Sequence, residues 1–254
     1  MIKIFHTLII AVAFAFGSSI AIAETITIVA ASSIKFAMTD IVNKFNAEHR
    51  NDEIKTIYGV SGKFTTQIQN GAPFDMFFAA DVNFPQILKK EGLTSTDPVI
   101  YAIGRLVIWS STTDASKLTL QKLSESTIRK LAIANPEHAP YGMRAKEAMK
   151  SAGVWEKVKG KLVFGENVEH AAHMVSTGAA DAGIIPLSLV LSPAMVKQGG
   201  YSLIDDALHD PLAQAFVITK RAKDNALARR FATYFQTPES RKIMESYGFV
   251  LPKK

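Results

Sequence analysis

Residues 28–38 read IVAASSIKFAM, and this stretch predicts the local structure on which the rest of the fold is built. A run of β-forming residues ends in two alanines, two serines follow, and a helical apolar spacing starts directly afterwards. A strand that passes into a helix in this way leaves free N–H groups at the helix N-terminus. The serines have two interpretations, because a hydroxyl there can cap the helix or help to bind an anion.

The first 23 residues have the composition of a secretory signal peptide. Lys3 supplies the charged start, residues 8–16 form an apolar core, and Ala21-Ile22-Ala23 has the small-residue spacing of a cleavage site before Glu24. The apolar core is too short to span a bilayer as a helix. We therefore expect residues 1–23 to be removed on export.

The sequence contains no cysteine, which excludes disulfides, thiolate metal sites and cysteine nucleophiles. It also excludes the acylated cysteine that anchors an exported lipoprotein. We expect the mature protein to be soluble in the periplasm and not to be a lipoprotein.

The net charge is +6, and removal of Lys3 with the leader leaves +5. The basic residues are dispersed along predicted helices, without the basic stripe and interleaved aromatic residues of a nucleic-acid binder. We therefore expect no nucleic-acid partner.

Strand and helix patterns alternate along the mature chain. Strands are predicted at residues 25–29, 54–58, 75–80, 106–109, 131–134, 161–164, 182–185 and 215–218. Helices are predicted at residues 34–45, 64–70, from 81 onward, and at 144–152, 168–176 and 226–236. Repeated βα units with buried strands indicate an α/β fold with a parallel sheet covered by helices. The length fits either one sheet or two lobes.

The strand–turn–helix junction of residues 28–38 recurs three times. Gly59-Val60-Ser61-Gly62, Ala139-Pro140-Tyr141-Gly142 and residues 164–168 each lead from a strand toward a helix. Ligands of open α/β sheets bind beyond the carboxyl ends of the strands, where such turns gather. The turns offer hydroxyl groups and backbone N–H groups.

Two enzyme motifs match this region only in part. Residues 59–63 resemble a nucleophile elbow, but Lys63 stands where the last glycine is required. They also resemble a P-loop, but Ile57 replaces its first glycine and Phe64 its serine or threonine. His170 and His173 share a helix face without a third ligand, so no zinc site is expected.

Six motifs occur in order along residues 24–254: Ala30-Ala31-Ser32-Ser33, Gly59-Val60-Ser61-Gly62, Gly71-Ala72-Pro73-Phe74-Asp75, Phe78-Ala79-Ala80-Asp81, residues 136–142 (PEHAPYG) and Tyr247-Gly248-Phe249. As an ordered set they resemble the periplasmic molybdate-binding (ModA) family of ABC-transporter substrate-binding proteins.

The resemblance implies a two-lobed α/β fold of the type II periplasmic-binding class, with the ligand in the cleft between the lobes. Residues 24–103 and 215–254 would form lobe 1, and residues 104–214 would form lobe 2. It also implies a binding protein rather than an enzyme, without a cofactor. Such a protein would act as a monomer that captures molybdate or tungstate and delivers it to the membrane permease of a molybdate ABC transporter.

The ligands implied by the resemblance are hydroxyl and backbone donors, without direct bonds between the protein and the metal. They are Ser32, Ser33, Ser61, Tyr141 and Val168. Many family members carry a ligating tyrosine where this chain has Pro186, which has neither an N–H nor a hydroxyl. We expect the Tyr141 phenol to replace it from the neighbouring turn.

Molybdate carries no proton at neutral pH, so each of its oxygens can only accept hydrogen bonds. Hydroxyls, backbone N–H groups and helix N-termini suit such an ion without any carboxylate or lysine. We expect Ser33 to cap its helix in the empty site and to donate to the anion in the filled one, and Lys63 to point to solvent. The alternatives are a relative that binds sulfate or another oxyanion, or an exported α/β hydrolase.

Overall fold

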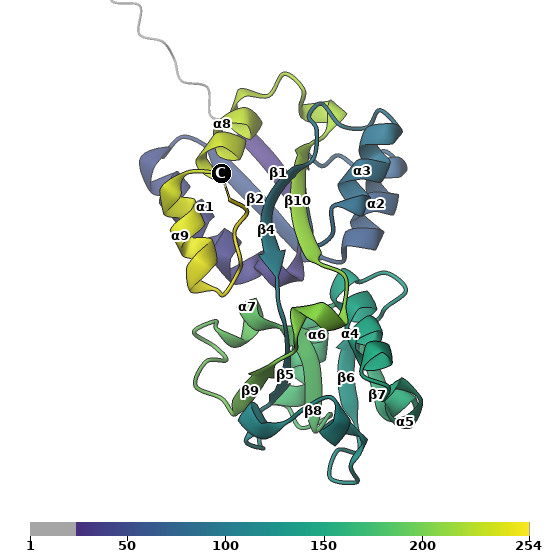
Figure 1. The fold of residues 1–254 in the computed structure, drawn as a ribbon. Coiled ribbons are helices and arrows are strands. Elements are labelled where there is room, and N and C mark those ends of the chain that lie inside the picture. Colours follow the sequence, from purple (N-terminus) through teal and green to yellow (C-terminus); the bar gives the residue numbers. More distant parts are fainter. Residues whose placement is uncertain (1–23, 254) are drawn as a thin grey trace, which may run out of the picture.

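The computed structural model describes residues 24–253, and the predicted signal peptide lies outside them. The described chain forms two lobes, one above the other in Figure 1, and each lobe contains one sheet covered by helices. The α/β class and the two-lobed architecture predicted from the sequence are confirmed. No helix within the described residues is long and apolar enough to cross a membrane.

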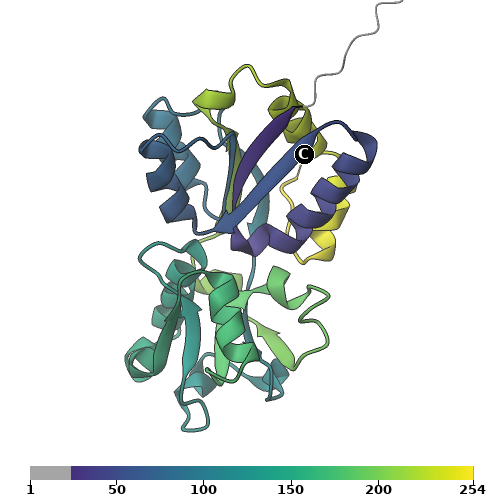
Figure 2. The same cartoon turned by 180° about the vertical axis from the view of Figure 1, so that it is seen from behind.

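Lobe 1 contains a five-stranded sheet in the order β2-β1-β3-β10-β4. Its strands are β1 Thr25–Ala31, β2 Glu53–Gly59, β3 Met76–Ala79, β4 Val99–Gly104 and β10 Leu212–Ile218. Its helices are α1 Lys35–Glu48, α2 Ser61–Gln69, α3 Asn83–Lys90, α8 Ala226–Tyr234 and α9 Pro238–Ser246. Figure 1 and Figure 2 show α2 and α3 on one face of this sheet and α1, α8 and α9 on the other.

Lobe 2 contains the second five-stranded sheet of the described chain, in the order β7-β6-β8-β5-β9. Its strands are β5 Leu106–Ser110, β6 Leu131–Ala134, β7 Leu162–Gly165, β8 Ala182–Pro186 and β9 Gly200–Leu203. Its helices are α4 Pro140–Ser151, α5 Trp155–Val158, α6 Val168–Ser176 and α7 Leu187–Val190. Short 3₁₀ turns complete the described chain: η1 Ser32–Ile34, η2 Ala115–Lys117, η3 Gln121–Ser124, η4 Lys159–Lys161, η5 Asp206–Leu208 and η6 Lys220–Ala222.

Both sheets are mixed, so the parallel sheet predicted from the sequence is only partly present. In lobe 1, β10 runs antiparallel to β3 and β4, and in lobe 2, β5 runs antiparallel to β8 and β9. These antiparallel strands are the ones that join the lobes. A strand buried on both faces is apolar in either direction, so its sequence pattern does not reveal its direction.

The chain crosses between the lobes twice, from β4 into β5 and from β9 into β10 (Figure 1). The first crossing is almost direct, because only Arg105 separates the two strands. The second crossing passes through η5 and a short extended segment. Lobe 1 is therefore built from both ends of the chain and lobe 2 from its middle.

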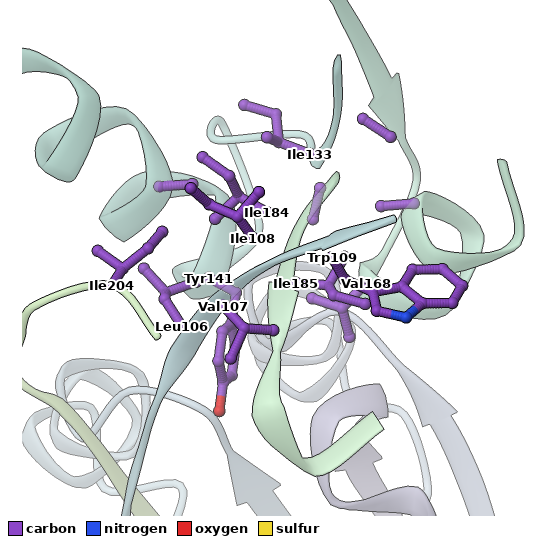
Figure 3. Packing of buried hydrophobic residues seen from close by; sticks show 14 of the residues in the cluster. Leu106, Val107, Ile108, Trp109, Ile133, Tyr141, Val168, Ile184, Ile185 and Ile204 are labelled. Atoms are coloured by element: carbon purple, nitrogen blue, oxygen red, sulfur yellow. The ribbon is translucent and has the colours of Figure 1, made fainter. Parts of the chain in front are cut away.

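Each lobe has its own apolar interior. Phe45, Phe78 and Phe231 are fully buried in lobe 1, and Trp109 and Ile184 are buried in lobe 2. Figure 3 shows the lobe 2 cluster with Tyr141 at its margin, its hydroxyl oxygen pointing away from the apolar residues. The loops at the facing ends of the two lobes form the candidate site.

Candidate functional site

A small cavity lies between the facing ends of the lobes. Its lining comes from four strand–helix junctions and the residue that follows β3: Ala31, Ser32, Ser33, Gly59, Val60, Ser61, Ala80, Ala139, Pro140, Tyr141, Asn167 and Val168. All five site residues predicted from the sequence are in this lining. It contains no charged side chain, so any charge on a ligand must be met by dipoles and hydrogen bonds.

Four helix starts face this cavity. Ser33 lies in η1, which leads into α1; Ser61 is the first residue of α2; Tyr141 is the second of α4; and Val168 is the first of α6. The first N–H groups of a helix have no acceptor within it, and each helix end carries roughly half a positive charge. Their convergence makes the cavity electropositive without any lysine or arginine.

Ser61 is held with its hydroxyl oxygen as an acceptor. The side chain is 1% exposed, and Ser61 Oγ accepts a hydrogen bond of 3.0 Å from the Ala80 backbone N–H. Since a hydroxyl has only one hydrogen, that hydrogen remains available for a ligand. Helix α2 begins at Ser61, three residues before the predicted start, which places this hydroxyl in the first turn.

Ser33 is the unsatisfied hydroxyl of the site. The residue is 2% exposed, and Ser33 Oγ has no hydrogen-bond partner among the described residues. The prediction that Ser33 caps its helix is wrong for this structure, because neither η1 nor α1 has a side-chain cap. A buried hydroxyl without a hydrogen-bond partner destabilises the folded protein, and a ligand that accepts its hydrogen would relieve this cost.

The hydroxyl of Ser32, the preceding serine, already donates its hydrogen to a protein group. Ser32 Oγ donates a hydrogen bond of 3.3 Å to the Gly59 carbonyl, which links the two junctions of lobe 1. Of the adjacent hydroxyls, only Ser33 therefore has its hydrogen free. Ser32 can still contribute its backbone to the cavity wall.

Tyr141 reaches from lobe 2 toward the crossing strands. Helix α4 begins at Pro140, four residues before the predicted start, because proline suits the first helical position. The Tyr141 hydroxyl accepts a hydrogen bond of 2.8 Å from Gln214 Nε2. Burial raises the pKa of Tyr141 well above its ordinary value, although the nearby Ser33 hydroxyl and the Gln214 amide lower it. The phenol is therefore protonated at neutral pH and has a hydrogen to donate.

Val168 contributes its backbone. Asn167 precedes α6 and accepts the His170 N–H through its side chain at 2.9 Å, while its carbonyl accepts the Ala171 N–H at 3.1 Å. As the first residue of α6, Val168 has an N–H group without an acceptor inside the helix, and the residue is part of the cavity lining.

Several contacts hold the lobes together around the cavity. Ser188 Oγ in α7 donates a hydrogen bond of 2.6 Å to the Ser33 carbonyl, and the Gly62 N–H donates one of 3.2 Å to the His138 carbonyl. Arg144 of lobe 2 pairs with Asp81 of lobe 1 at 2.8 Å, and both side chains are largely buried.

Two exposed ion pairs also join the lobes. Lys35 contacts Glu169 at 2.6 Å, and Lys63 contacts Glu166 at 2.6 Å. Lys63 is about half exposed and does not line the cavity, in keeping with the expectation that it points to solvent, but its ammonium group also pairs with Glu166 of the other lobe. Together with the buried contacts, these pairs indicate that the lobes are closed over the cavity.

Sequence reasoning missed the residues that support this site from a distance. Gln214 in β10 donates to the Tyr141 hydroxyl, Tyr101 in β4 donates to Gln214, and Gly104 leaves room for the phenol. No local motif marks them, because each is an ordinary strand residue whose partner lies far along the chain. Pro186 ends β8 and is not part of the cavity lining.

The chemistry of the cavity is that of a donor-only site. Hydroxyl-bearing residues and helix N-termini line it, and the lining has no carboxylate that could accept a hydrogen bond from a protonated ligand. Within residues 24–253 no group of His, Cys, Asp or Glu side chains is arranged to hold a metal ion. The arrangement suits an anion whose oxygens all accept hydrogen bonds.

Comparison with known proteins identifies the family. A family model described as bacterial extracellular solute-binding protein matches residues 26–250. The molybdate-binding protein ModA of Azotobacter vinelandii is 34% identical over 230 residues, 90% of this chain and 91% of that relative. ModA of Rhodobacter capsulatus is 35% identical over 196 residues, 76% of this chain and 75% of that relative.

A solved structure agrees with these sequence relatives. The periplasmic molybdate-binding protein of Azotobacter vinelandii superposes with a TM-score of 0.84 at 28% identity, covering 90% of this chain and all of that one. The family model, the Azotobacter relative and the shared fold all span nearly the whole described chain. The chain therefore belongs to the family of bacterial extracellular solute-binding proteins.

Proposed function

We propose that this protein captures molybdate, and tungstate alike, in the cavity between its lobes and delivers it to the permease of a molybdate ABC transporter. The observation that carries the proposal is the donor-only cavity, in which a buried Ser33 hydroxyl has no hydrogen-bond partner within residues 24–253. The names of the Azotobacter and Rhodobacter relatives, both molybdate-binding proteins, support the choice of ion.

The proposed ligands are the hydroxyls of Ser33, Ser61 and Tyr141, with backbone donors at Ser32 and Val168. Each faces the cavity, and the four helix starts supply the positive potential that a dianion needs. The oxygens of the ion would accept every bond, so no protein atom would bind the metal itself. The site thus needs no cofactor and no catalytic residue.

The proposed lobe division is residues 24–103 and 215–254 against residues 104–214. The membership of the two sheets supports it to within a few residues, since β4 ends at Gly104 and β10 begins at Leu212. We further propose that the mature protein is a soluble periplasmic monomer without a lipid anchor. Intact-mass measurement of the exported protein would check the cleavage before Glu24.

Calorimetry with molybdate, tungstate, sulfate and phosphate tests the proposed function. We expect tight binding of the first two ions and weak or no binding of the others. A smaller ion cannot reach every donor of a closed cavity and would leave buried donors unpaired, at about 1–3 kcal/mol each. Comparable affinity for sulfate would assign the site to another oxyanion, while ester hydrolysis by the purified protein would favour the hydrolase alternative.

A further inference from the structure

Three buried polar side chains form a chain of hydrogen bonds beside the cavity. The Tyr101 hydroxyl of β4 donates to Gln214 Oε1 of β10 at 2.9 Å, and Gln214 Nε2 donates to the Tyr141 hydroxyl of α4 at 2.8 Å. Tyr101 is 5% exposed, Gln214 0% and Tyr141 2%. The chain of bonds runs from lobe 1 into lobe 2 at the point where the strands cross.

The Tyr101 end determines which way the Gln214 amide points. The only hydrogen-bond partner of the Tyr101 hydroxyl among the described residues is the Gln214 amide. If the amide were turned round, its NH₂ would face Tyr101 and the phenolic hydrogen of Tyr101 would be buried without an acceptor. A buried unpaired donor costs more than an unused lone pair, so Gln214 keeps Oε1 toward Tyr101 and Nε2 toward Tyr141.

The amide orientation in turn determines what Tyr141 can offer. The Tyr141 oxygen accepts a hydrogen bond from the Gln214 Nε2–H group, so the phenol cannot also donate its single hydrogen to Gln214. That hydrogen remains available on the side of the cavity, where Ser33 and the proposed ligand lie. Ser61 is oriented by the same principle, because its oxygen accepts the Ala80 N–H. Both hydroxyls are thus set as donors before any ion arrives.

Gly104 allows this arrangement. A Cβ at Gly104 would overlap the Tyr141 hydroxyl oxygen and would lie 2.6 Å from Gln214 Nε2. The phenol and the amide therefore meet directly over the backbone of the first crossing strand. This close approach explains a glycine at the end of β4, where a β-former would otherwise be favoured.

We propose that Gln214 is a positioning residue, oriented by Tyr101, that commits the Tyr141 hydroxyl to donate and so selects a fully deprotonated oxyanion. Gln214 acts through Tyr141 and does not itself touch the ion. The inference rests on the proposed function, since it names the residue that prepares one ligand of that site. It extends the site by one buried layer into the crossing strands.

A double-mutant cycle on the full-length mature protein tests the inference. The molybdate dissociation constant is measured by calorimetry for the wild type, Gln214→Met, Tyr141→Phe and the double variant. We expect Gln214→Met to weaken binding about 2- to 12-fold, the worth of one neutral hydrogen bond. Tyr141→Phe should weaken it about 10- to 150-fold, the worth of a bond to a charged ligand.

The double variant gives the decisive result. We expect it to bind as Tyr141→Phe does, to within about twofold, because Gln214 has nothing to position once the hydroxyl is absent. Independent, multiplying losses, or an unchanged dissociation constant for Gln214→Met, would overturn the inference. A wild type that binds no molybdate would instead refute the proposed function.

A second pair of variants examines the Tyr101 end. Tyr101→Phe removes the group that orients the amide and should weaken binding in the wild type but not in the Tyr141→Phe background. Tyr247→Phe is the matched control, because the Tyr247 hydroxyl also bonds a side chain, Asp40 at 2.8 Å, but Tyr247 is not part of the cavity lining. Equal effects of the two tyrosine variants on affinity would count against the inference, and melting of the empty proteins checks that each variant is folded.

Discussion

The hydroxyl groups that line this site differ in whether the protein supplies a hydrogen-bond partner for them. Ser61 Oγ is paired with the Ala80 N–H, whereas Ser33 Oγ is buried without a partner in the described part of the chain. The first group contributes to the folded state whether or not a ligand is bound. The second imposes a cost that a ligand would relieve.

This difference predicts opposite effects of two matched substitutions on the empty protein. Ser33→Ala removes an unsatisfied hydroxyl, so the melting temperature without ligand should stay the same or rise. Ser61→Ala strands the Ala80 N–H at a cost of about 1 kcal/mol, which should lower the melting temperature by about 2–4 °C. Both variants should weaken molybdate binding about 10- to 150-fold.

Thermal melting with and without molybdate, beside calorimetry, measures both effects. A clear loss of stability in empty Ser33→Ala would show that this hydroxyl has a structural partner. Unchanged affinity would remove Ser33 from the proposed ligands.

Sequence reasoning reached the cavity residues but not the residues behind them. Ser33, Ser61 and Tyr141 stand at strand–helix junctions, where sequence order alone brings them to one edge of a sheet. Gln214 lies in a strand, and its partners are 113 and 73 residues away. Nothing local in the sequence indicates such a partnership, because it depends on which strands the two crossings bring together.

Helix α2 supplies one of the hydrogen bonds that join the two lobes. Its second residue, Gly62, donates its N–H to the His138 carbonyl of the other lobe. A Cβ at Gly62 would lie 2.9 Å from that carbonyl oxygen, closer than side-chain carbons normally come to an oxygen. A residue larger than glycine would therefore interfere with the closed arrangement and not with lobe 1 itself.

We expect Gly62→Ala to weaken molybdate binding several-fold while the empty protein melts at the same or a higher temperature. Alanine favours the helix by about 1 kcal/mol over glycine, but it forces the lobes apart at His138. Gly160→Ala is the control, because a Cβ there meets no atom within 4 Å. Equal molybdate affinity of Gly62→Ala and Gly160→Ala would mean that the backbone at His138 can move aside without weakening binding.

Asp181 fixes the start of strand β6 in lobe 2. Its carboxylate accepts the backbone N–H groups of Lys130 and Arg129, each at 2.8 Å, and it also pairs with the Arg129 side chain. The hydrogen bond from Lys130 leads the contacts that lower the pKa of Asp181 below its ordinary value. The stabilisation is thus complete above the ordinary aspartate pKa and is lost as the pH falls through the lowered one.

Asp181→Asn should therefore melt a few degrees below the wild type at neutral pH. This difference in melting temperature should disappear as the pH falls through the range in which the wild-type carboxylate takes up its proton. Melting temperatures measured in steps from pH 7 to about pH 2 follow this change. A gap that stays constant with pH would mean that the ionised form of Asp181 has no special role.

At the level of whole elements, burial explains what the sequence could and could not predict. Strands β6 and β8 were located closely because both are buried apolar runs between turn residues. Strand β9 was missed because it is a half-exposed edge strand without a clear apolar pattern. Strand β4 was missed because only Arg105 separates it from β5, so the two crossing strands look like one segment.

For the whole molecule, closure of the lobes relies on one buried ion pair and two exposed ones. The Arg144 and Asp81 side chains are only 11% and 7% exposed, whereas Lys63 and Glu166 are 48% and 62% exposed. Exposed pairs contribute little and are screened by salt. The Arg144–Asp81 pair is therefore the main electrostatic contact across the cleft.

We expect Arg144→Met to reduce molybdate affinity at least about tenfold, because the closed form would then bury Asp81 without its cationic partner. Lys63→Met should have a much smaller effect, and one that disappears at high salt. Arg129→Met is the control, since Arg129 pairs with Asp181 inside lobe 2. Calorimetry at low and high salt checks all three, and equal losses for Arg144→Met and Lys63→Met would refute this ranking.

The order of the strands in the chain also determines the order in which the two lobes can fold. Strands β5 to β9 are contiguous in the chain, so lobe 2 can complete its sheet as soon as residue 203 is available. Lobe 1 must wait, because β10 fits between β3 and β4 and comes after all of lobe 2. A chain emerging from its N-terminus would thus hold an open sheet edge on β3 until residues 212–218 arrive. We expect the middle of the chain to fold first, its two ends to join later, and the cavity, which needs both lobes, to form last.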